Sequence, residues 1–155
     1  MKDYDEYQKI MRYKYGYYSF ILLLALLLLN EFIMTSPDPQ WGETNGLETL
    51  FIMGIVLFVF NIATIYHNAY FSKRENVAWY LLFDVLMSAF YIFILFSNKA
   101  GFPDNLFIEG KLSFNSFNLL IGLIFLTRPI TYLIRKGIDK FRDKEQRSNR
   151  DNFLS

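Results

Sequence analysis

Two charged side chains each interrupt a long uncharged segment of the sequence. Asp84 is the one charged residue from 78 to 98, and Arg128 is the one charged residue from 112 to 134. A charge in an apolar environment is costly unless a partner neutralises it, so opposite charges of this kind favour an ion pair, or a site for an ion, a proton or a polar substrate. We therefore predict that Asp84 and Arg128 pair with each other.

Further polar side chains are spaced so that they share the faces of the same predicted helices. Asn61, Thr64 and Asn68 follow one another at intervals of three and four residues, which places them on one helical face. Ser88 lies one helical turn after Asp84. The hypothesis is one polar cluster, formed by Asn61, Thr64, Asp84, Ser88 and Arg128. It has two interpretations: a structural network that joins the helices, or a site for a substrate, an ion or a proton.

Secondary candidates flank this cluster. His67 and Asn68 lie near the end of the second uncharged segment, and Glu31 follows the first. We expect Glu31 to be solvated rather than buried. Pro129 lies inside the fourth segment, and its missing N–H predicts a helix kink at that position.

The composition excludes several kinds of chemistry. The chain has one histidine and no cysteine, which excludes disulfides, thiolate metal sites, iron–sulfur clusters, thiol catalysis and a histidine-based metal cluster. It contains neither a glycine-rich phosphate loop nor the nucleophile elbow of a serine hydrolase. We therefore expect a protein that is not an enzyme and that holds neither a metal nor a cofactor.

Four long apolar segments must position these residues. Each is close to the ~20 residues that cross a hydrocarbon core about 30 Å thick, and a helix satisfies its own backbone polar groups there. Hydrophobic residues make up 53% of the chain and charged residues 20%, but the charges gather between the segments. The sequence predicts an all-α, integral membrane four-helix bundle in one domain over residues 1–155. The spans are expected at about 16–34, 48–70, 78–98 and 113–134, with tails at 1–15 and 135–155.

Lysine and arginine are distributed unevenly among the connections. Thirteen of the 16 Lys and Arg residues lie in the N-terminal tail, the 71–77 connection and the C-terminal tail, whereas two lie in a connection on the opposite side. The positive-inside rule therefore favours a multi-pass protein of the plasma membrane with both termini in the cytoplasm. The short 71–77 connection also predicts that the second and third spans form a tight antiparallel hairpin.

The general character of the chain adds a resemblance. The chain is small, has four predicted spans, carries a tyrosine- and lysine-rich N-terminal flank, and is rich in Phe, Ile, Asn, Lys and Tyr. In these respects it resembles small, uncharacterised four-span membrane proteins of low-GC Gram-positive bacteria. The segment from Phe71 to Val77 is similar to an inner connection in one family of such proteins, but its flanks differ, so no functional residue is carried over. The resemblance implies an accessory, immunity or regulatory protein.

These observations together favour a small accessory or regulatory subunit that works through helix contacts. Its expected partners are the lipid bilayer and either another membrane protein or further copies of itself. One alternative is a subunit of an oligomeric transporter or channel, with Asp84 and Arg128 lining a path. Another is a protein that protects against a membrane-active peptide. Nucleic-acid binding is not expected, because acidic residues dilute the basic C-terminal tail.

Overall fold

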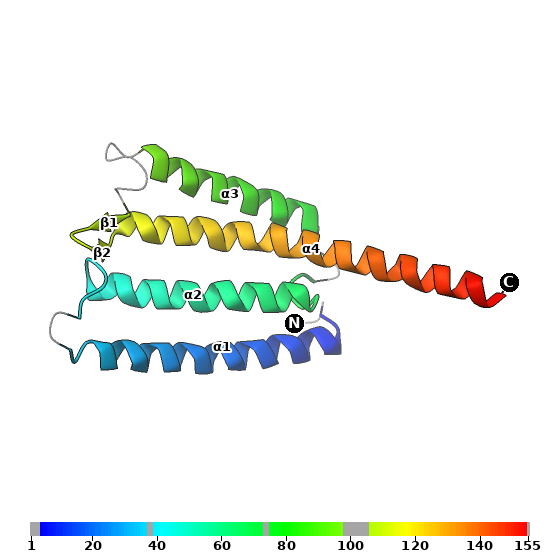
Figure 1. Ribbon diagram of the computed structural model, residues 1–155, viewed down its shortest axis with the longest axis horizontal. Coiled ribbons are helices and arrows are strands. Elements are labelled where there is room, and N and C mark those ends of the chain that lie inside the picture. Colours follow the sequence, from blue (N-terminus) through cyan, green and yellow to red (C-terminus); the bar gives the residue numbers. More distant parts are fainter. Residues whose placement is uncertain (1–3, 37–38, 73–74, 98–105, 155) are drawn as a thin grey trace.

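Four long helices and one short β-hairpin make up the structure, a computed structural model that describes residues 4–36, 39–72, 75–97 and 106–154 (Figure 1). The long apolar segments form helices because a helix pairs its backbone groups within the segment. The all-helical prediction is confirmed. The helices are α1 (Glu6–Ile33), α2 (Asn45–Tyr66), α3 (Val77–Ser97) and α4 (Phe114–Leu154), and the hairpin pairs β1 (Phe107–Ile108) with β2 (Lys111–Leu112).

All four helices are long and apolar enough to cross a membrane. Three of their ends differ from the predicted spans by four residues or more: α1 begins at Glu6 rather than at residue 16, α2 ends at Tyr66 rather than at residue 70, and α4 continues past residue 134 to Leu154. The chain enters α1 and leaves α4 at the same end of the molecule, which we call the terminal end (Figure 1). The opposite end carries β1 and β2, and we call it the hairpin end.

The helices lie side by side in a row, in the order α1, α2, α4, α3 (Figure 1). The predicted tight hairpin of the second and third spans is therefore wrong, because α4 lies between them. The physical reason for the position of α4 is that it packs closely against both α2 and α3. A Cβ atom added to Gly54 of α2 would lie 2.6 Å from a methyl carbon of Leu120, and one added to Gly122 would lie 3.4 Å from Cβ of Tyr91 on α3. Small residues let apolar helices approach each other in this way.

At the terminal end, one side chain links the start of α1 to the connection between α2 and α3. Gln8 closes a capping box with Asp5, since its N–H donates to Asp5 Oδ1 (2.7 Å) and its Oε1 accepts from the Asp5 N–H (3.3 Å). Its Nε2 also donates to the carbonyls of Asn68 (2.7 Å) and Phe71 (3.1 Å). Asn68 has a positive φ of 54°, which turns the chain sharply. Gln8 thus holds this turn against α1.

At the hairpin end, the buried carboxylate of Glu48 holds the connection between α1 and α2. Its Oε1 accepts hydrogen bonds from the backbone N–H groups of Trp41 and Gly42, both at 2.9 Å. The indole Nε1 of Trp41 donates to Asn30 Oδ1 of α1 (2.8 Å), and the Trp41 carbonyl accepts from the Leu112 N–H (2.8 Å). One carboxylate therefore ties together α1, α2 and the strand that leads into α4.

Glu48→Ala tests this arrangement. We expect it to lower the free energy of unfolding by about 3 kcal/mol, because two buried N–H groups lose a charged acceptor. The measurement is the unfolding of the purified protein in detergent, followed by circular dichroism. The matched control is Glu31→Ala, which removes an exposed carboxylate from the same end and should change that free energy by less than about 0.5 kcal/mol. Equal effects of the two substitutions would contradict the role given to Glu48.

Candidate functional site

The two charges of the apolar segments form an ion pair between α3 and α4. Arg128 Nη1 lies 2.8 Å from Asp84 Oδ1, and the exposed fractions of the two side chains are 23% and 2%. The structure thus contains the contact that the sequence predicts. Because the charges neutralise each other at this distance, neither helix carries an uncompensated charge into its apolar surroundings.

Aromatic rings cover the guanidinium group of this pair. Arg128 Cζ lies 5.3 Å from the ring centroid of Tyr70 and 5.4 Å from that of Phe125, both within the range of a cation–π interaction. Phe125 belongs to α4, whereas Tyr70 comes from the connection between α2 and α3. A tyrosine phenol is neutral at physiological pH. The connection therefore places a neutral ring on the ion pair.

Two polar atoms near the pair are buried without a hydrogen-bond partner among the described residues. They are Arg128 Nε and Ser88 Oγ. Ser88 follows Asp84 by one turn on α3, and its side chain is buried. A guanidinium N–H and a hydroxyl group can bind a water molecule or a small polar ligand. The site therefore has hydrogen-bonding capacity beyond the ion pair itself.

The members of the predicted cluster that lie on α2 are buried, but they are not joined to the ion pair. Asn61 and Thr64 are 4% and 1% exposed. The Thr64 hydroxyl donates to the carbonyl of Phe60, one turn earlier in the same helix (2.7 Å), which is how threonine commonly satisfies its hydroxyl within a helix. No hydrogen bond between described residues links Asn61 or Thr64 to the pair. The structure thus divides the predicted cluster between α2 and the α3–α4 site.

The structure places the secondary candidate residues at a helix end, in a turn, on the surface and within a helix. His67 is the C-cap residue of α2, and its ring stacks on that of Tyr15 from α1 at a centroid distance of 5.1 Å. Asn68 forms the turn with positive φ, and Glu31 is exposed. The helix α4 continues through Pro129, so this residue does not end it. Within the described ranges, no group of three His, Cys, Asp or Glu residues is placed to hold a metal ion.

Sequence reasoning missed two residues that the structure places at important contacts. Tyr70 is one of 11 tyrosines, and most of them fit ordinary anchoring at a membrane interface, so its type alone did not distinguish it. Glu48 lies at the edge of an apolar segment, where a carboxylate is usually solvated. The one available signal was position: Glu48 falls in the first turn of α2, where a negative charge is favoured by the helix dipole.

Exchanging the two charges of the pair tests whether they contact each other directly. Asp84→Arg or Arg128→Asp alone would bury two like charges together, and each should lower the free energy of unfolding by about 3–5 kcal/mol. The double substitution should recover a large part of this loss, measured by the amount of expressed protein and by unfolding in detergent.

The control for this experiment is the exposed pair that Asp139 forms with Arg142 at 3.1 Å. Reversing the charge of Arg142, which is the exposed partner of the two, should cost no more than about 1 kcal/mol, because solvent screens the interaction. If the double exchange at positions 84 and 128 restores none of the expression lost by the single changes, the direct pairing is refuted.

Known proteins offer no template for this site. Comparison of the chain with protein-family models, curated proteins and solved structures finds no match. The role of the Asp84–Arg128 pair therefore follows from the residues and the fold alone.

Proposed function

We propose that this chain is a small, non-enzymatic accessory or regulatory subunit of a membrane complex. In this proposal, its four helices cross the plasma membrane and both termini lie in the cytoplasm, as the distribution of lysine and arginine favours. The chain contacts another membrane protein through the part of α4 that extends beyond the other helices. The Asp84–Arg128 pair has a structural role in this proposal, since it holds α3 against α4.

The length of α4 is the observation that carries the proposal. This helix has 41 residues, whereas α2 has 22 and α3 has 21. About 20 residues suffice to cross a hydrocarbon core, and the remainder of α4 projects past the other helices at the terminal end (Figure 1). A polar helix of this length is marginally stable in water without packing contacts. Binding to a partner gives such an extension a surface on which to pack.

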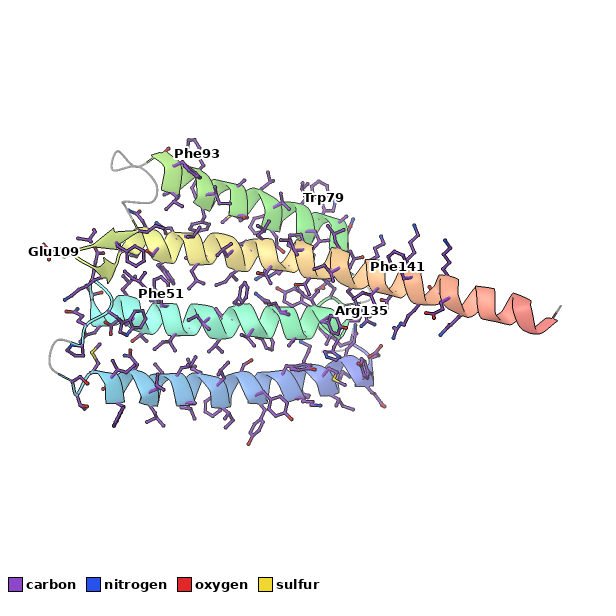
Figure 2. The ribbon with its side chains drawn as sticks, in the orientation of Figure 1. Phe51, Trp79, Phe93, Glu109, Arg135 and Phe141 are labelled. Carbon is purple, nitrogen blue, oxygen red and sulfur yellow. The ribbon has the colours of Figure 1, made fainter. Side chains whose placement is uncertain are left out.

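The extension offers a suitable surface for a partner. Asp139 accepts hydrogen bonds from Arg135 (2.9 Å) and Arg142 (3.1 Å), and these contacts support about two turns of helix. Phe141 lies beside them on the extension (Figure 2), and 76% of its surface is exposed. Phenylalanine and arginine are both enriched at protein–protein interfaces relative to the rest of the surface. We therefore place the centre of the contact at Phe141.

The arrangement of the helices supports an accessory role over a transport path within one chain. The helices form a row in which α4 packs on α2 and α3, and α2 packs on α1. A row does not enclose a pore, so a channel or transporter would need further copies. The two charges in the apolar segments already neutralise each other. We therefore favour the accessory role over the transporter alternative.

Site-specific photo-cross-linking in cells tests the proposed contact. A photo-reactive phenylalanine analogue at position 141 should give one discrete product with a larger membrane protein, identified by mass spectrometry. In addition, Phe141→Ala should lower co-purification of that protein in mild detergent by about tenfold or more, as expected for a hot-spot residue.

The matched control is the same analogue at position 32. Phe32 is 78% exposed, close to the 76% of Phe141, but it lies on α1 near the hairpin end. It should not give the product seen from position 141. If position 141 gives no product, or gives only a dimer of this chain, the proposed partner is refuted.

A further inference from the structure

An apolar groove runs between α2 and α4, on the half of the row nearest to the terminal end. The groove has a volume of about 470 Å³, and its lining includes Phe58, Ile62 and Tyr66 of α2 and Leu123, Ile130 and Ile134 of α4. The α2 residues are spaced four apart, and the α4 residues are spaced seven and four apart. Each set therefore forms one stripe along its helix. The two stripes are the walls of the groove.

The length of the groove matches the depth of one leaflet of a bilayer. From Leu123 to Ile134 the axis of α4 rises about 16 Å, at roughly 1.5 Å per residue. This is about half of a hydrocarbon core that is about 30 Å thick. The groove ends at Ile134, immediately before the charged extension of α4. An acyl chain that lies along it would therefore place its headgroup at the start of the extension.

A positively charged cluster stands at this end of the groove. Arg135 Cζ lies 5.3 Å from the ring centroid of Tyr66, one of the lining residues, and Figure 2 labels Arg135 beside the end of α2. Asp139 accepts from Arg135 Nε and is shared with Arg142, so the three residues carry one net positive charge. The two Nη groups of Arg135 make no hydrogen bond to the described part of the chain. They are therefore available as donors to an anion.

We propose that this groove binds an anionic phospholipid, with one acyl chain along the apolar stripes and the phosphate at Arg135. An acyl chain gains little by leaving the surrounding lipid for the groove, because both are equally apolar. Selection must therefore come from the headgroup. The guanidinium group of Arg135 presents paired donors that match a phosphate, and the net positive charge of Arg135, Asp139 and Arg142 favours a headgroup whose phosphate is not offset by a choline cation. The inference rests on the proposed insertion into a membrane, but not on the proposed partner protein.

Native mass spectrometry of the purified full chain tests this proposal. The probe is an equimolar mixture of phosphatidylglycerol and phosphatidylcholine with identical acyl chains, supplied in mixed micelles. The wild type should retain one phosphatidylglycerol molecule, preferred about fivefold over phosphatidylcholine, as one basic residue near a membrane surface can provide. Arg135→Gln should abolish this preference. Ile130→Trp, which fills the groove, should lower the retention of both lipids.

Two matched controls separate the site from general effects of charge and size. Lys144→Gln removes one positive charge from the same helix, about 14 Å along its axis from Arg135. Salt largely screens exposed charges from each other at this distance. Leu133→Trp adds the same ring to α4 at a position that is 64% exposed and does not line the groove. Both variants should retain lipid as the wild type does.

Three outcomes would overturn the proposal. The first is equal retention of the two lipids by the wild type. The second is an unchanged preference in Arg135→Gln, or an equal loss of preference in Lys144→Gln, since either would remove Arg135 from the site. The third is an equal loss of lipid in Leu133→Trp and Ile130→Trp, which would exclude the groove. None of these outcomes changes the cross-linking result expected at position 141. The lipid proposal and the partner proposal are therefore tested independently.

Discussion

A charged side chain in the apolar part of a helix has to be neutralised within the protein, and Asp84 and Arg128 neutralise each other across 2.8 Å. This requirement fixes α3 against α4 at one depth and one rotation of each helix. It also accounts for the surroundings of the pair. Tyr70 can cover the guanidinium group only because the connection between α2 and α3 turns at Asn68 and is held there by Gln8.

The central position of α4 follows from contacts on both of its faces. On one face it carries Arg128 and Gly122, which meet α3, and on the other it packs against Gly54 of α2. The same helix begins beside the β-hairpin and continues past the other helices at the terminal end (Figure 1). In the proposed membrane, α4 is therefore the one helix that is both the structural centre of the row and the element presented to a partner. The proposed lipid groove also lies on it, where its apolar part ends.

The sequence was sufficient to predict the four long helices and the ion pair, but it did not predict the β-hairpin or the continuation of α4 to Leu154. Long uncharged segments give a strong signal for helices, and a single charge in each of two such segments leaves few possible partners. The order of the helices could not be predicted in this way, because it depends on close contacts at Gly54 and Gly122. In the sequence, these two glycines cannot be distinguished from glycines that make no such contact. The spacing of Asn61 and Thr64 correctly indicated a buried face. It did not show that Thr64 satisfies its hydroxyl within its own helix.

The most direct test of this account is disulfide cross-linking between helices, which the absence of cysteine from the chain makes straightforward. A Cβ at Gly122 would lie 3.4 Å from Tyr91 Cβ, close to the separation that a disulfide spans. With Gly122→Cys and Tyr91→Cys together, oxidation in membranes should form an intramolecular bond between α3 and α4. The pair Ile62→Cys and Phe83→Cys, which joins α2 to α3, should form none. A disulfide between positions 62 and 83, with none between 91 and 122, would contradict the central place of α4.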